Sequence, residues 1–466
     1  MSTLRRRLVA VGATAIASTL VIAGCAATEE ETTSGSTGST GGDSGSTEET
    51  MEGCDFYADY MGNEGTEVEI YTTIIDPEAS LFIDSFGEFE ECTGITINWN
   101  GSQDFETQIQ VRAEGGTAPE LAIFPQPGLL ADMARTGYMV AAPQQVADSV
   151  DANYTADWKV YGTVDGVFYA APLGANVKSF VWYSPKTFAD NGWTIPTTWD
   201  ELLALSDTIA ASGASQPWCV GVESGVATGW AATDWMEDLM LRFQDAETYD
   251  RWVSNDLAFN SPEVLEVINE ADKILRNPDY VGNVQAIAAT SFATAGGGLV
   301  DGSCAMHRQA SFIGGILAAD FGAQIVTPED TDVEGGITTF YFPGVSADNR
   351  PALGGGEFVG AFSDRPEVQA VQHYLTTAEW NNKKAADGGS WFSAHLGLKQ
   401  ESVADPVNKV AVDILQNAST FRFDASDLMP GAVGAGTFWT EMTAWFAEGK
   451  DSQAVLDAIQ ASWPAD

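Results

Sequence analysis

Between residues 66 and 136 the hydrophobic and polar positions switch back and forth between two periods. Three segments alternate every second residue or form a short apolar run, as strands do, and a segment with apolar residues at helical spacing follows each one. The strands are expected at 67–73, 94–99 and 120–124, and the helices at 77–93, 103–114 and 128–136. This β-α-β-α-β-α order predicts an α/β domain with a largely parallel sheet.

The pattern continues with more helix after residue 165. A capping box is expected at Thr198 and Glu201, and Ser261 with Pro262 is typical of a helix start. Further strands are expected at 164–172, 177–183, 216–222, 304–307 and 337–342. Further helices are expected at 185–191, 198–211, 264–276, 366–380, 407–416 and 437–448. With about 415 residues of globular composition, the body is long enough for two domains.

The N-terminal segment has the layout of a secretory signal. Arg5, Arg6 and Arg7 precede an apolar run that ends in Ala23-Gly24-Cys25. This ending resembles the bacterial lipobox, which implies a lipoprotein signal peptide over 1–24 and lipidation of Cys25. An ordinary signal peptide or a short membrane anchor are the alternatives. Residues 25–52 are mostly Ser, Thr, Gly and Glu, a composition that predicts a flexible tether.

Charge narrows the set of partners. The formal net charge is −45, spread along the chain, so nucleic acid and anionic lipid headgroups should be repelled. The body has no run of about 18 apolar residues and is expected to be soluble, with membrane contact through the lipid only. Nothing in the sequence indicates a cofactor, and His307 and His395, which are far apart in the sequence, make a poor metal site.

The chain has five cysteines. If Cys25 carries lipid, four remain, and they allow three pairings. Outside the cytoplasm these thiols should be oxidised, and we favour Cys54 with Cys92 and Cys219 with Cys304. Free buried thiols are the alternative.

Several segments, in order, resemble the extracytoplasmic solute-binding proteins of carbohydrate ABC importers, the class that includes maltose-binding protein. They are APELAIF with GLLADMARTGYMVAA, DGVFYAAPLGANVKSFVWYSPKTFADNGW with PTTWDELLAL, DGSCAMHRQASF, and GGEFVGAFSDRPEVQAVQHYL. The pieces PWCVGVESG, ATGW and ATDWMED resemble the α-glucoside-binding subgroup.

The resemblance implies an α/β, two-lobe periplasmic-binding-protein-like fold with discontinuous lobes joined by a hinge. Lobe one would take 66–171 with 306–357, and lobe two 177–302 with 360–466. A monomer would bind an oligosaccharide, an α-glucoside above all, between the lobes and close on it. It would then deliver the sugar to the transmembrane subunits of an ABC permease.

Candidate ligand-binding residues follow from the chemistry of sugars. Sugar ring faces pack on aromatic rings, and hydroxyls need paired donors and acceptors. Tryptophans beside glycine and aspartate in loop-like segments suit the first task, and polar residues near strand ends suit the second. The candidates are Asp104, Phe124, Gln126, Trp230, Asp234, Trp235, Arg308, Ser311, Glu357, Phe358 and Trp391.

Three alternatives stay open at this stage. Carboxylates abound, so a glycosidase pair is compatible with the composition. However, G-x-S-x-G, H-E-x-x-H, a P-loop and a strand followed by G-x-G-x-x-G are all missing, and a protein that is not an enzyme is expected. The other two alternatives are a binding protein for a non-sugar solute and a structural lipoprotein.

Overall fold

The computed structural model describes residues 53–403, 405–417 and 420–464. The signal peptide predicted over 1–24, lipidation of Cys25 and the whole tether predicted over 25–52 lie outside these residues. Within the described part of the chain, no helix combines the length and apolarity that a membrane crossing needs. The described residues form one compact unit.

The first sheet has the strand order β13-β12-β3-β1-β2, and β6 pairs with β12 as well. Its strands are β1 (Glu67–Thr72), β2 (Thr96–Gly101), β3 (Leu121–Phe124), β6 (Ala170–Val177), β12 (Ala352–Ala361) and β13 (Phe421–Phe423). β1 pairs in parallel with β2 and β3, while β12 runs antiparallel to β3 and β6. The alternating strands and helices expected over 66–136 are confirmed.

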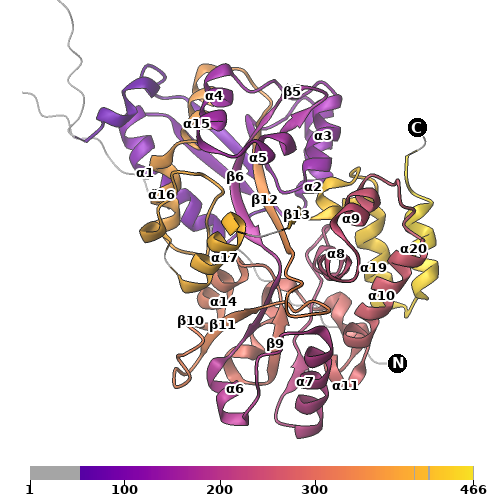
Figure 1. Ribbon diagram of the computed structural model, residues 1–466. Coiled ribbons are helices and arrows are strands. Elements are labelled where there is room, and N and C mark those ends of the chain that lie inside the picture. The colour runs from indigo at the N-terminus through magenta and orange to yellow at the C-terminus, as the bar shows by residue number, and fades with distance from the viewer. Residues whose placement is uncertain (1–52, 404, 418–419, 465–466) are drawn as a thin grey trace, which may run out of the picture. The chain divides into compact units, whose positions relative to one another are not determined.

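Helices cover this first sheet, and together they form what we call the first lobe (Figure 1). They are α1 (Glu78–Thr93), α2 (Phe105–Glu114), α3 (Pro127–Arg135), α4 (Gln144–Asn153), α5 (Ala156–Tyr161), α15 (Pro366–Tyr374), α16 (Ala378–Ala386) and α17 (Pro406–Asn417). Short pieces complete the lobe: η1 (Asp55–Tyr60), η3 (Gln400–Ser402) and the hairpin of β4 (Thr163–Val164) and β5 (Val167–Phe168). On α1, Phe82, Phe86 and Phe89 share one face at helical spacing and are buried, which fixes the helix on the core.

The second sheet has the order β10-β11-β7-β9-β8. Its strands are β7 (Phe180–Tyr183), β8 (Gln216–Trp218), β9 (Cys304–Arg308), β10 (Gln324–Ile325) and β11 (Gly336–Tyr341). The long helices around it are α6 (Pro185–Asn191), α7 (Trp199–Ser212), α8 (Trp230–Phe243), α9 (Ala246–Val253), α10 (Pro262–Leu275), α14 (Ile313–Phe321), α19 (Trp439–Ala447) and α20 (Ser452–Gln460). Shorter helices are α11 (Pro278–Val281), η2 (Val284–Ala289), α12 (Phe292–Ala295), α13 (Gly298–Asp301), α18 (Ala425–Leu428) and η4 (Val433–Phe438). We call this assembly the second lobe.

Local sequence signals fix two of these helices. The Thr198 hydroxyl accepts a hydrogen bond from the Glu201 backbone N–H, and the Glu201 carboxylate accepts one from the Thr198 backbone N–H. The predicted capping box of α7 is therefore present. Ser261 caps α10, with Pro262 at its first position.

Two disulfides are formed, between the pairs favoured from the sequence. Cys54 pairs with Cys92 and Cys219 with Cys304, with Cα atoms 5.5 Å and 5.7 Å apart. The first ties the start of the described chain to the end of α1. The second joins the segment after β8 to the start of the neighbouring strand β9.

The chain crosses between the sheets three times, after β6, after β11 and after β13. This differs from the expected lobe segments, which placed 306–357 in lobe one and 360–466 in lobe two. β9 and β11 pair inside the second sheet, while α15 and β13 belong to the first. Strand periodicity tells where strands occur but not which sheet they join, so the crossing expected near residue 306 was wrong.

Candidate functional site

A cavity of ≈ 210 Å³ lies between the lobes, beside the first crossing. The first lobe contributes the loop from β1 to α1, the loop before α2 and the loop after α16. The second lobe contributes the loop before α8, together with α12 and α14. Its main lining residues are Ile74, Asp76, Glu78, Phe82, Gln103, Asn176, Lys178, Ser224, Trp230, Phe292, Phe312, Asp320, Glu357, Ser390, Trp391 and Asp427.

Aromatic rings line the cavity from both lobes. On the second-lobe side the Trp230 ring packs edge-on against Phe292, with centroids 4.9 Å apart, and also lies near Phe312. On the first-lobe side Trp391 lies edge-on to Phe82 at 6.2 Å. Because neighbouring rings hold each other, the cavity has fixed apolar walls on two sides.

Trp230 is placed by a glycine at the start of α8. Gly229 has φ +118, and a Cβ there would lie 2.2 Å from the Trp439 carbonyl oxygen. A side chain at this position would therefore both strain the backbone and collide with α19. Glycine lets the helix begin close to α19, so Trp230, in its first turn, lines the cavity.

Two glutamates bring carboxyl groups to the first-lobe side of the cavity. Glu78 is the first residue of α1, and Glu357 lies on β12 where the pairing with β6 shifts register between Gly356 and Phe358. Burial is the main cause that raises the pKa of each carboxyl group to about 7, and for Glu78 the nearby Glu357 contributes to this rise. Among the described residues, no cation lies within ion-pair distance of either carboxyl.

Lys384 lies behind the rings on this side. Its side chain is buried, and its Nζ is 4.6 Å from the centre of Phe82 and 5.3 Å from that of Trp391. Burial lowers the Lys384 pKa to about 8, although Glu78, Asp387 and Glu357 act in the opposite direction. The ammonium is held by ring faces and by charges at longer range.

Two residues that line the first-lobe side of the cavity also carry a buried polar atom that has no hydrogen-bond partner within the described part of the chain. Trp391 Nε1 and Asn176 Oδ1 are inaccessible to water and make no hydrogen bond. Gly174 provides the room here, because a Cβ on it would lie 2.2 Å from Glu357 Oε2 and 2.9 Å from Trp391 Nε1. Leaving a buried donor and a buried acceptor unpaired is costly, and a ligand hydroxyl that reached both atoms would offset that cost.

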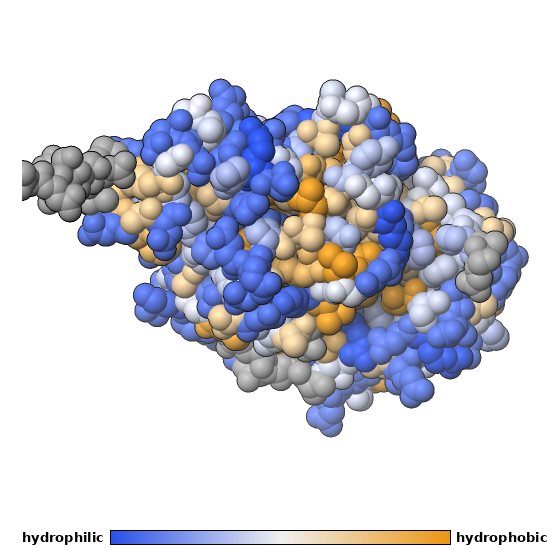
Figure 2. Space-filling model, turned by 90° about the horizontal axis from the view of Figure 1, so that it is seen from above, coloured by the Kyte–Doolittle hydropathy of each residue, from blue (hydrophilic) through white to orange (hydrophobic). Residues whose placement is uncertain are grey.

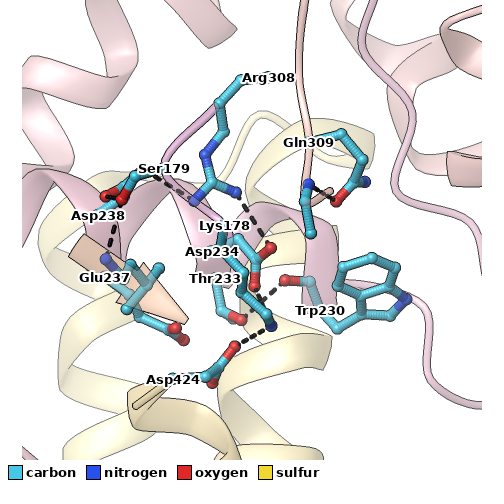
Figure 3. Close-up of polar contacts among 12 residues, drawn as sticks. Lys178, Ser179, Trp230, Thr233, Asp234, Glu237, Asp238, Arg308, Gln309 and Asp424 are labelled. Atoms are coloured by element: carbon cyan, nitrogen blue, oxygen red, sulfur yellow. Dashed lines mark hydrogen bonds and ion pairs between the residues drawn. The ribbon is translucent and has the colours of Figure 1, made fainter. Parts of the chain in front are cut away.

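The opposite side of the cavity rests on a buried ion network, drawn in Figure 3. Lys178 Nζ contacts Asp234 at 2.9 Å, Asp424 at shorter range and Asp427 at 4.0 Å. Arg308 donates to Asp234 at 3.0 Å and to Asp238 at 3.1 Å. Asp238 also pairs with Arg242 one turn along α8, so the network is continuous. We use the term ion network for these residues together with Glu237.

The ion network touches all three crossings. On the first, Lys178 is followed by Ser179, whose hydroxyl donates to Asp238 and accepts from the Leu353 backbone. On the second, Arg242 donates to the Phe342 carbonyl oxygen. On the third, Asp424 binds Lys178. Helix α8 therefore holds the three connections between the lobes at one place.

The carboxyl groups of the network differ in how closely a cation is paired with them. Burial acts to raise the pKa of Asp424, but Lys178 outweighs it and holds the pKa at about 2. Burial and the neighbouring Asp424 raise the pKa of both Glu237 and Asp427 well above the usual range. Oxygens of Asp234, Glu237 and Asp424 lie within 4.8 Å of one another, a spacing that could suit a metal. In this structure the Lys178 ammonium binds two of the three.

Comparison with known proteins decides the family. The family model for bacterial extracellular solute-binding proteins matches residues 75–382. The chain belongs to this family. The predicted two-lobe α/β fold is confirmed with it, as is the resemblance to the solute-binding proteins of carbohydrate ABC importers.

Two curated relatives are each 37% identical to this solute-binding protein. One is the osmoprotective compounds-binding protein GgtB of Synechocystis sp., over 85% of this chain and 92% of its own. The other is the alpha-glucosides-binding periplasmic protein AglE of Rhizobium meliloti, over 86% and 87%. Among solved structures, the bacterial solute receptor AcbH covers 86% of this chain and 98% of its own, with TM-score 0.71 and 16% identity. RafE with raffinose covers 85% and 98%, with TM-score 0.66 and 17% identity. The two structures support the fold alone.

The structure brings three of the eleven candidate ligand residues to the cavity of this solute-binding protein. They are Trp230, Glu357 and Trp391. Asp234 and Arg308 are buried in the ion network behind it. Trp235, one turn along α8 from Trp230, packs between Trp218 and Phe342. Helical periodicity turns Trp235 toward the core, because residues five apart lie on different faces of a helix.

The remaining candidates lie away from the cavity wall. Phe124 and Phe358 face each other in the register of β3 and β12 and are buried. Asp104 is exposed just before α2, and Gln126 donates to Glu106. Ser311 is buried, and its hydroxyl accepts from the Val177 backbone. Their contact with ligand stays a prediction from the sequence.

Several residues of the cavity were not among the candidates. Glu78 and Phe82 follow the end of β1, where the rule that open α/β sheets bind ligands beyond strand ends would have pointed to them. Lys178 had a signal too, as a lone lysine between two apolar strands. Phe292, Phe312 and Asp427 come from short segments without such a pattern.

Proposed function

We propose that this protein captures a short α-glucoside in the cavity between its lobes and delivers it to the permease of an ABC importer. The observation that carries the proposal is the combination of ring walls from both lobes with polar groups that have no partner. Sugar faces pack on rings such as Trp230 and Trp391, while hydroxyls both donate and accept. AglE, an alpha-glucosides-binding protein that is 37% identical to this chain, supports the α-glucoside class.

The size of the cavity supports a short ligand. Its ≈ 210 Å³ lies below the roughly 300–1,000 Å³ of sites that hold drug-sized ligands. We therefore narrow the oligosaccharide expected from the sequence to one or two sugar rings. The carboxyl groups of Glu78, Glu357 and Asp427 around it favour an uncharged ligand over an anionic one.

An osmoprotective solute is the second candidate ligand. It is favoured by GgtB, which is as similar to this chain as AglE is and aligns over nearly its whole length. A small polyhydroxyl osmoprotectant would use the same rings and the same unpaired groups. The two candidates therefore differ in the ligand, not in the site.

The remaining parts of the proposal concern the cell. A lipid on Cys25 would hold the protein at the outer face of the cell membrane, and a monomer would present the closed lobes to the permease. Binding without chemical change is proposed, because the relatives are binding proteins. Growth in labelled palmitate tests the anchor: wild type should carry label, and Cys25→Ala should carry none.

Calorimetric titration tests the ligand. Trehalose, sucrose, maltose and maltotriose would be titrated into the purified body, and each mixture analysed afterwards for new products. Saturable heat with one or more disaccharides and unchanged sugar supports the proposal. New product would contradict it in favour of an enzyme, and no heat with any of the four would contradict the α-glucoside class.

A further inference from the structure

Two charged residues belong to the ion network and also line the cavity. They are Lys178, on the first crossing, and Asp427, in α18 just after the third crossing. Asp234, Asp238 and Arg308 lie behind them and are fully buried. A ligand in the cavity can therefore reach the network through the Lys178–Asp427 pair.

This pair is the longest of the three ion pairs that Lys178 makes among the described residues. Nζ lies 4.0 Å from Asp427 Oδ2, beyond the 2.7–3.2 Å of a hydrogen bond, while Asp234 and Asp424 are both within bonding range. An ammonium has three N–H donors, and two are used by these aspartates. The third donor is left for the cavity side.

We propose that a ligand hydroxyl bridges Lys178 and Asp427, and that this bridge couples occupancy of the cavity to the relative position of the first and third crossings. The hydroxyl would accept from Lys178 Nζ and donate to the Asp427 carboxyl group. The inference rests on the proposed function, because only a ligand with free hydroxyl groups can make both bonds. Trp230, whose ring centre is 5.5 Å from Nζ, would hold the adjacent sugar face.

The coupling follows from where the two residues sit. A ligand shifts a conformational equilibrium only by binding one state better than the other. The bridge can form only when the two crossings lie as they do here, with the side chains about one hydroxyl apart. Ligand binding would therefore favour this arrangement of the crossings over an opened one.

The test measures sugar affinity and compaction together. Trehalose, sucrose and maltose would be titrated into wild type, Asp427→Ala, Lys178→Met and the double variant, and X-ray scattering would give the radius of gyration with and without sugar. Asp348→Ala is the matched control, since Asp348 is an exposed aspartate that neither lines the cavity nor belongs to the network. Lys178→Arg keeps the charge should Lys178→Met fail to fold.

We expect Asp427→Ala to weaken each bound sugar about 10- to 100-fold and to abolish the sugar-dependent compaction. The double variant should lose little more than either single variant, since one bridge is removed in all three. Asp348→Ala should stay within about threefold of wild type, and Lys178→Arg should retain part of the affinity.

Two results would overturn the bridge while the proposed function stands: sugar affinity of Asp427→Ala within threefold of wild type, or additive losses in the double variant. A wild type that gives no heat with any of the sugars would overturn the proposed function itself, and the bridge with it. Sugar binding without compaction would overturn the coupling.

Discussion

The two sides of the cavity bury charge in opposite ways. In the ion network, Asp234, Asp238 and Asp424 each contact a buried cation. On the first-lobe side, Glu78 and Glu357 have no cation within ion-pair distance among the described residues. The three network carboxylates are fully buried and are matched by cations of the protein, whereas Glu78 and Glu357 are partly buried and unmatched.

This difference separates a structural role from a binding role. Burying a charge is costly, and pairs with additional hydrogen bonds offset most of the cost. The network has such pairs and holds the crossings. The unmatched carboxyl groups of Glu78 and Glu357 instead have a pKa of about 7, so near neutral pH each is present in both its protonated and its ionised form. They are available to form hydrogen bonds with a ligand. The outer surface contrasts with both, because hydrophilic side chains cover most of the face seen in Figure 2.

Arg308→Met would remove a cation from the ion network and should lower stability the most. It leaves Asp234 without its guanidinium and deprives Asp238 of one of two, in a site with no access to water. Removing one partner of a buried pair costs about 3–5 kcal/mol, so urea unfolding should show a loss of that size. Arg251→Met, at an exposed position on α9, should change stability by less than about 0.5 kcal/mol. A small loss for Arg308→Met would mean that the network does not hold the fold.

The two tryptophans at the start of α8 give a matched pair. Trp235 is buried against Trp218 and Phe342, so Trp235→Ala should lower stability by about 3–5 kcal/mol. Trp230 is half-buried and lines the cavity, so Trp230→Ala should weaken sugar binding by about 1–3 kcal/mol with little change in melting temperature. Calorimetry and thermal melting on both variants check this. If Trp230→Ala unfolds early and binds normally, the residue belongs to the core.

The sequence predicted the elements far better than their partners. Periodicity located α1 and β1 within a few residues because local burial sets the period. It did not assign β9 or β11 to a sheet, because pairing is a long-range choice. For the site, Trp230, Glu357 and Trp391 could be found from loop context. Asp234 and Arg308 were predicted to bind ligand, but the sequence does not show that they are buried behind the cavity wall, because residue type alone does not determine burial.

Gly174→Ala tests the first-lobe side of the cavity, where Glu357 has no cation partner in the part of the chain that the structure describes. The new methyl group would lie 2.2 Å from Glu357 Oε2 and 2.9 Å from Trp391 Nε1, so the carboxyl group must move and the ring must adjust. Such overpacking costs about 1–3 kcal/mol, and we expect most of it to appear as lost sugar affinity. The ion network should be untouched, so urea unfolding should change less than for Arg308→Met. Unchanged affinity would show that the ligand does not use this end of the cavity.

The smallest expected effect is a pH dependence from Glu357. Its pKa is raised from 4.5 to about 7 in the folded protein, so the folded state holds the proton more tightly than the unfolded state. The resulting stability is fully present below about pH 4.5 and is lost as the pH rises through about 7. Glu357→Gln stays neutral and should escape this loss. The variant should match wild type at pH 5 and exceed it by roughly 1 kcal/mol at pH 8, where cavity water screens part of the charge.

Glu91→Gln, at an exposed position on α1, is the control for general relief of the acidic surface. Urea unfolding of the ligand-free protein at both pH values isolates the effect, since the common background of the other acids cancels in the difference. A gain at pH 8 that is equal for both variants would mean that net charge, and not burial beside the cavity, sets the stability. A gain confined to Glu357→Gln would show that this carboxyl is held unmatched at a cost to the empty protein. That cost is expected of a group kept for a ligand, and it is absent where Lys178 already matches Asp424.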